Sequence, residues 1–111
     1  MSDLHLRPRV TIDETSTPLS EREEYDFLPQ IKRWSLDKKK IHHIRKLFHF
    51  KTFMDAIEFV NRVAAIAEEL DHHPDIFISY QHVTVSIWTK SIHGLTENDF
   101  ILAARIDTLA D

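Results

Sequence analysis

A single amphipathic stretch, residues 53 to 70, constrains the fold of this chain more than any other segment. Apolar side chains recur there at intervals of three and four, the spacing that places them along one stripe of an α-helix. The stripe consists of Phe53, Ile57, Val60, Ala64, Ala67 and Leu70. Such a helix must bury its stripe, so the pattern predicts one long helix packed against a second layer of structure.

The predicted helix ends in the sequence Asp71-His72-His73-Pro74. A proline disfavours helical backbone at the residue before it, so the helix cannot continue through His73. Two adjacent imidazoles therefore lie where carbonyl groups lack partners and where positive charge is stabilised. Because the unperturbed pKa of histidine lies close to neutral pH, the pair indicates proton-transfer chemistry.

Two other interpretations of the histidine pair stay open from the residues alone. A histidine at a helix end is most often a capping or surface residue. A metal site would combine His72 or His73 with His82 or His93, but neighbouring helical positions point about 100° apart and rarely share one ion. The chain has eight histidines, so their number alone does not say which are functional.

Capping and alternation patterns predict the remaining elements. Ser20 with Glu23 fits a capping box and begins a short helix, and Thr96 with Asp99 begins a last helix. The predicted strands cover residues 34–36, 41–50, 76–80 and 82–88. The resulting order predicts an α+β two-layer sandwich, with helices packed on one face of a four-stranded antiparallel sheet. Gly94 is the only glycine, which suggests a backbone conformation that other residues disfavour.

Size and composition limit the classes of protein that this chain can belong to. Residues 1–18 are polar and show no sustained period, so we expect a flexible N-terminal tail, followed by one domain over residues 19–111. A net charge of −4 argues against bulk binding to nucleic acid. No apolar run approaches the about 20 residues that span a bilayer, and residues 1–9 lack the apolar core of a secretory signal. We therefore expect a cytoplasmic protein that binds no membrane.

The spacing of several side chains around the histidine pair resembles a known family. An acidic residue, three residues, His-His-Pro, an aromatic residue and a later acid are present as Glu68, His72-His73-Pro74, Tyr80 and Asp99. Further resemblance lies in Phe50, Phe53, Val83, Val85, Ile87, Thr89, Gly94, Leu95 and Thr96. Over about residues 20–107 the chain is similar to the pterin-4a-carbinolamine dehydratases, also called 4a-hydroxytetrahydrobiopterin dehydratases.

The resemblance implies a hydro-lyase that converts 4a-hydroxytetrahydropterin to a quinonoid dihydropterin, in the recycling of tetrahydrobiopterin. It implies that His72 is a general acid or base and that His73 positions the substrate or transfers a second proton. Glu68 and Asp99 would orient the imidazoles, and Tyr80 would help to bind substrate. No metal and no organic cofactor is expected. Members of the family commonly form dimers or tetramers, so a homodimer or homotetramer is expected.

One departure from the family pattern concerns a third histidine. The family has histidine, sometimes tryptophan, ten residues after the aromatic residue, where this chain has Lys90. His93 follows in the same loop and is the nearest imidazole that could replace it. Lysine serves in acid–base chemistry near neutral pH only when burial lowers its pKa strongly. The alternative is therefore a catalytically weakened, dehydratase-like protein-binding factor, similar to a transcriptional coactivator or to a rubisco assembly factor of carboxysomes.

Overall fold

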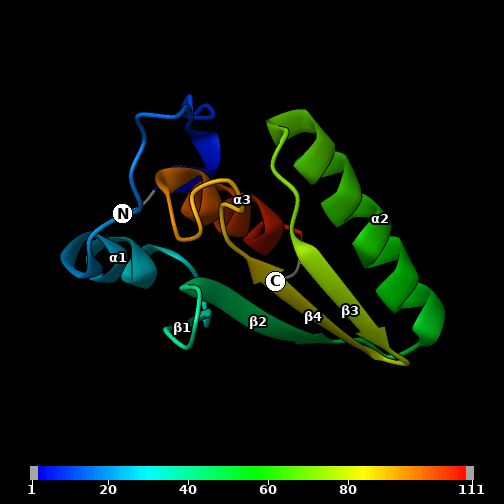
Figure 1. Cartoon of the computed structure of the whole chain (residues 1–111). Coiled ribbons are helices and arrows are strands. Elements are labelled where there is room, and N and C mark those ends of the chain that lie inside the picture. The colour runs from blue at the N-terminus through cyan, green and yellow to red at the C-terminus, as the bar shows by residue number, and fades with distance from the viewer. Residues whose placement is uncertain (1–2, 110–111) are drawn as a thin grey trace.

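The computed structural model describes residues 3–109, which form three α-helices, two short 3₁₀ helices and four strands (Figure 1). The helices are η1 Leu4–Leu6, α1 Glu21–Phe27, η2 Leu28–Gln30, α2 Phe53–Leu70 and α3 Glu97–Asp107. The strands are β1 Ser35–Asp37, β2 His43–His49, β3 Asp75–Ser79 and β4 His82–Ile87. The predicted order of helices and strands is confirmed, and the long helix has the predicted ends.

The four strands form one antiparallel sheet in the order β1-β2-β4-β3. Side chains alternate between its two faces, and the register pairs Ile44 with Ile87 and Phe48 with Val83 on the buried face. The helices cover this face and leave the other face open, so the predicted α+β sandwich is confirmed (Figure 1). The open face carries Leu47 and Phe77, whose exposed fractions are 61% and 67%.

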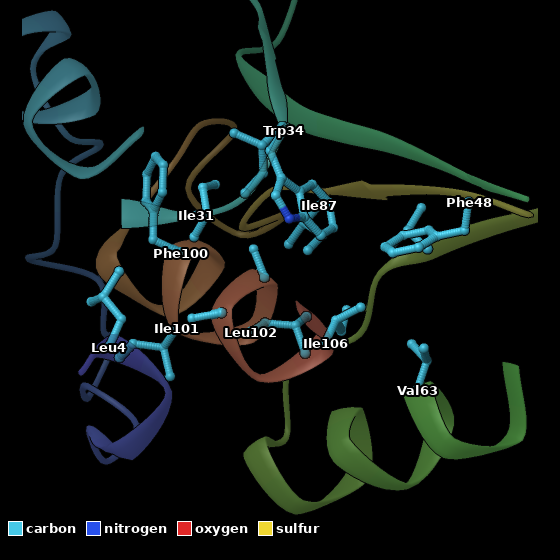
Figure 2. Packing of buried hydrophobic residues seen from close by; sticks show 14 of the residues in the cluster. Leu4, Ile31, Trp34, Phe48, Val63, Ile87, Phe100, Ile101, Leu102 and Ile106 are labelled. Atoms are coloured by element: carbon cyan, nitrogen blue, oxygen red, sulfur yellow. The ribbon is translucent and has the colours of Figure 1, made fainter. Parts of the chain in front are cut away.

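Helix α3 forms the centre of the hydrophobic core. Figure 2 shows its side chains Phe100, Ile101, Leu102 and Ile106 among residues of the sheet and of the N-terminal part of the chain. All four are fully buried, and Phe100 stacks on Phe27 with ring centroids 5.2 Å apart. Because α3 is enclosed on nearly every side, its position is fixed, and so is that of any polar group at its N-terminus.

Helix α2 buries only part of the stripe that the spacing predicted. The buried residues are Ala56, Phe59, Val63, Ala67 and Leu70. Phe53, which the prediction placed in the buried stripe, is 45% exposed, and Ala64 is also exposed. The helix is apolar over a broad arc, so more than one stripe fits the helical spacing, and contact of Phe59 with Phe48 and Phe50 decides which faces the sheet.

Residues 3–18, which we call the N-terminal segment, run across α3. Leu4 is buried in the core at 1% exposure, and Arg7 pairs with Glu97 at 2.9 Å. The backbone of Val10 makes two hydrogen bonds with the side chain of Asn98, donating to Oδ1 at 2.7 Å and accepting from Nδ2 at 2.8 Å. The expected mobility of this segment stays a prediction, but its described residues have defined contacts.

None of the helices within residues 3–109 combines the length and the apolar character that crossing a membrane requires.

Candidate functional site

A left-handed residue ends helix α2 and directs the histidine pair toward the sheet. Asp71 has a φ of 51°, and its N–H donates to the carbonyl oxygen of Glu68 at 3.2 Å. The N–H of His72 donates to the carbonyl oxygen of Ala67 at 3.0 Å. These two bonds form a Schellman closure, in which the last carbonyls of a helix find partners as the chain turns away. His72 and His73 therefore lie just beyond the helix rather than within its last turn.

The imidazole of His72 is held by a buried carboxylate. Its Nε2 lies 2.5 Å from Oδ1 of Asp99, and the exposed side-chain fractions are 12% for His72 and 0% for Asp99. The other oxygen of Asp99 accepts from Oγ1 of Thr89 and from the backbone N–H of Thr96, both at 2.8 Å. An ionised carboxylate only accepts hydrogen bonds, so this network assigns the proton to Nε2 of His72.

The first turn of α3 positions Asp99. Thr96 is the N-cap residue, and Asp99 closes the capping arrangement by accepting from its backbone N–H. The hydroxyl groups of Thr89 and Thr96 lie 2.8 Å apart, and Thr89 pairs with Gly94 across the loop that follows β4. Asp99 therefore has two functions, because one carboxylate caps the helix and also orients His72. The two interpretations of this residue, as a helix cap and as an orienting group, are compatible.

His73 points to a different partner, on the surface of α2. Its Nε2 lies 2.5 Å from Oε2 of Glu68, and the exposed side-chain fractions are 53% and 76%. Exposed pairs of this kind contribute roughly 0–1 kcal/mol to stability, so the contact mainly fixes the direction of the ring. Within residues 3–109, no three side chains of histidine, cysteine, aspartate or glutamate come together as ligands for one metal ion.

Lys90 occupies the edge of the same site. Its Nζ donates to Oδ1 of Asp75 at 2.8 Å and to the carbonyl oxygen of His73 at 3.4 Å. The same ammonium group lies 5.1 Å from the centroid of the Trp88 ring. The side chain is half exposed, so the ammonium group is solvated and paired rather than buried.

The two histidines and Lys90 line a surface hollow of about 260 Å³. The lining residues are Arg9, Ile12, Asp71, His72, His73, Trp88, Thr89, Lys90, Ser91 and Asn98. A hollow of about 300 Å³ lies elsewhere, around Leu4 and Asp107, so size alone does not identify a site. The hollow beside His72 is distinguished by its chemistry, because it combines a carboxylate-held imidazole, a second imidazole and an ammonium group.

Two of the predicted site residues lie away from this hollow. Tyr80 is in the turn between β3 and β4, at the end of β3 remote from His73, with φ of 52° and 67% exposure. His93 is exposed, has φ of 58° and does not line the hollow. The expectation for Gly94 was also wrong, because its φ is not positive. A Cβ there would lie 2.9 Å from Cβ of Pro18, so close packing explains the glycine.

Seven residues of the hollow were not among the predicted site residues: Arg9, Ile12, Asp71, Trp88, Thr89, Ser91 and Asn98. Arg9 and Ile12 reach it because the N-terminal segment is bonded to Asn98, a contact between residues 88 positions apart. No local pattern signals such a contact. Asp99, the residue after Asn98, was the predicted site residue that indicated that the start of α3 belongs to the site.

The fold and the site define a class of α+β protein in which an imidazole bonded to a buried carboxylate lies where the long helix meets the sheet. Residues 17–109 match the family described as pterin 4 alpha carbinolamine dehydratase, and the chain belongs to this family. A relative from Halorhodospira halophila, provisionally named a pterin-4-alpha-carbinolamine dehydratase, is 47% identical over 83% of this chain and 84% of its own length. One from Rubrobacter xylanophilus, with the same provisional name, is 38% identical over 98% of this chain and 100% of its own.

Two solved structures are similar to the chain in fold. A transcriptional coactivator/pterin dehydratase from Brucella melitensis aligns with a TM-score of 0.80 and 34% identity, over 86% of this chain and 100% of its own. A pterin dehydratase-like protein identified as a RuBisCO assembly factor in the alpha-carboxysome aligns with a TM-score of 0.61 and 26% identity, over 71% of this chain and 90% of its own. The solved structures similar to this chain therefore include one described as a coactivator/dehydratase and one described by an assembly role.

Proposed function

We propose that the protein is a hydro-lyase that dehydrates a 4a-hydroxytetrahydropterin to the quinonoid dihydropterin. The observation that carries this proposal is the imidazole of His72, bonded to the buried carboxylate of Asp99 and lining the hollow. Membership of the dehydratase family supports the same reaction. The hollow also has His73 on its lining, so a second group for proton transfer or substrate binding lies next to the first.

The reaction breaks one C–O bond and moves two protons. An acid protonates the leaving hydroxyl group, which departs as water, and a base takes a proton from a ring nitrogen whose electron pair forms the new C=N bond. Nε2–H of His72 is engaged by Asp99, so Nδ1 is the atom available for proton exchange. Neither step changes the redox state of the protein, and an imidazole can serve as acid or base near neutral pH.

The test is the rate of dehydration of a freshly generated 4a-hydroxytetrahydropterin in the presence of purified protein. Replacing His72 with alanine is expected to lower the catalysed rate about 10²–10⁴-fold, the usual contribution of a general acid or base. The matched control is His82→Ala, which removes an exposed histidine from strand β4. A wild-type rate equal to the spontaneous rate, or equal losses in both variants, would refute the proposal.

Lys90 is proposed to weaken this activity relative to an enzyme with histidine at that position. Its ammonium group is paired with Asp75 and half exposed, so it is not placed to accept a proton. The variant Lys90→His is expected to raise the dehydration rate by about tenfold or more, the low end of what an added acid–base group supplies. An unchanged rate would mean that the third imidazole is dispensable here.

A second candidate function is protein binding on the same scaffold. Leu47 and Phe77 are exposed on the open face of the sheet and lie on either side of Thr84 in the register, so they share one cross-strand row. The RuBisCO assembly factor among the similar structures supports this candidate. Capture of one specific protein by the wild type, lost in Phe77→Ser and accompanied by no dehydration, would favour binding over catalysis.

We also propose that the chain forms a homodimer or homotetramer. The exposed apolar side chains Phe53 and Met54 on α2, with Leu47 and Phe77 on the sheet, are surfaces that a second copy would cover. Sedimentation equilibrium should give a mass that is two or four times the chain mass of 13.1 kDa. A concentration-independent mass equal to that of one chain would refute this part of the proposal.

A further inference from the structure

The N-terminal segment brings a positively charged side chain to the hollow from outside the region that defines the family. The family match begins at residue 17, whereas Arg9 and Ile12 both line the hollow beside His72 and His73. These two lining residues therefore lie outside the part of the chain that the family model matches. Arg9 adds a guanidinium group, which is always charged and suited to binding an oxyanion through two hydrogen bonds.

The backbone next to Arg9 is held by Asn98. Val10 forms its two hydrogen bonds with the side chain of Asn98, which is 2% exposed. Asn98 precedes Asp99, the carboxylate that orients His72. The same turn of α3 thus holds both the imidazole of His72 and the backbone beside Arg9, so the Arg9 side chain starts from a fixed point at the rim of the hollow.

No carboxylate within residues 3–109 neutralises the charge of Arg9. In the part of the chain that the structure describes, Arg9 has no ion-pair partner, whereas Lys90 is paired with Asp75 and His72 with Asp99. Asp71 is the other charged side chain of the lining that lacks an ion-pair partner, and its carboxylate has the opposite sign. A ligand in the hollow therefore meets one unpaired cation and one unpaired anion on the lining.

We infer that Arg9 is a specificity-determining residue that binds an oxyanion on the side chain of the pterin, a carboxylate or a phosphate. This inference rests on the proposed function, because it takes the pterin ring to lie beside His72 and His73. Arg9 then receives the substituent that projects from the ring toward the N-terminal segment. A reduced pterin with an anionic side chain is accordingly preferred over one whose side chain is neutral.

The test compares three fluorescent pterins that differ in the side chain alone: 6-hydroxymethylpterin, its phosphate ester and pterin-6-carboxylate. Their dissociation constants are measured by fluorescence titration with wild type, Arg9→Ala, Arg9→Lys and Asp71→Asn. Arg22→Ala on α1 is the control, because it removes the same charge from an exposed position outside the hollow. All binding is measured at one ionic strength, since exposed charges are screened by salt.

Arg9→Ala is expected to raise the dissociation constant of at least one anionic ligand about five- to tenfold. It should raise that of the neutral ligand less than about twofold, as for the loss of one exposed charge-assisted contact. Arg9→Lys should recover part of the lost affinity, and Asp71→Asn should lower the dissociation constant of the same anionic ligand by about twofold. The ligand that responds more strongly identifies the group as phosphate or carboxylate. Equal responses of all three ligands to Arg9→Ala, or the same loss in Arg22→Ala, would overturn the inference. Failure of every pterin to bind any variant would overturn the proposed function itself, which is a different result.

Discussion

Replacing Asp99 with asparagine tests the central contact of the site, because the change keeps the shape and removes the charge. The carboxylate accepts three hydrogen bonds, from Nε2 of His72, Oγ1 of Thr89 and the N–H of Thr96. An asparagine has one acceptor oxygen, which can serve Thr89 and Thr96. Its NH₂ group then faces His72, and two donors would meet unless the imidazole moves its proton to Nδ1.

This inversion of the His72 tautomer removes the free acceptor that the reaction requires. We expect the dehydration rate to fall about 10²–10⁴-fold, as if the general acid or base were deleted. The free energy of unfolding should fall by about 1–3 kcal/mol, the value of one hydrogen bond to a charged group. Urea unfolding gives the second quantity, and the ¹⁵N chemical shifts of the imidazole report the tautomer directly.

The double variant His72→Ala/Asp99→Asn separates the two functions of Asp99. If Asp99 acts on the reaction through His72, the double variant should be no slower than His72→Ala alone, whereas its stability should carry the further loss. An Asp99→Asn protein that is less stable but retains the wild-type rate would refute the reasoning. Asp99 would then be a helix cap whose contact with His72 has no consequence for catalysis.

Three further predictions concern the fold and the loop after β4. His93→Gly should stabilise the protein by about 0.5 kcal/mol, because it relieves a left-handed backbone with φ of 58°, and should leave the dehydration rate unchanged, since His93 does not line the hollow. Phe100→Ala should lower the free energy of unfolding by about 3–5 kcal/mol in urea titrations, because the side chain is fully buried and stacks on Phe27. The backbone N–H of Ser20 lowers the pKa of Glu23, so this carboxylate stabilises the fold above its unfolded pKa and the contribution is lost as pH falls through the folded value. The stability difference between wild type and Glu23→Gln should therefore shrink as the pH falls below about 4.3, the ordinary pKa of a glutamate, and a difference that does not change with pH would contradict the assignment.

Local sequence patterns were sufficient to predict the elements of the fold. The apolar spacing gave both ends of α2, and the capping residues Ser20 and Thr96 gave the starts of α1 and α3. The choice of buried stripe on α2 was not predictable, because it depends on Phe48 and Phe50 from another part of the chain. Local periodicity reports that a helix is amphipathic, but the partner decides how the helix is rotated.

The site was predictable to the extent that its geometry follows from a motif. The resemblance predicted that Glu68 and Asp99 orient the imidazoles without assigning either acid to one histidine, and the structure pairs Asp99 with His72 and Glu68 with His73. The position of His93 depends on a left-handed conformation that histidine rarely adopts, so its direction was not predictable from the sequence. The contribution of Arg9 depends on contacts with Asn98 that span most of the chain.

The first turn of α3 and its N-cap residue join His72, the loop after β4 and the N-terminal segment through three of four consecutive residues. Thr96 and Asp99 bind the loop and His72, and Asn98 binds Val10. Fraying of this one turn would release all of these attachments together, so the hollow would lose its carboxylate-bonded imidazole and its N-terminal wall in a single event. Amide hydrogen exchange in the turn thus provides a measure of how often the whole site is dismantled.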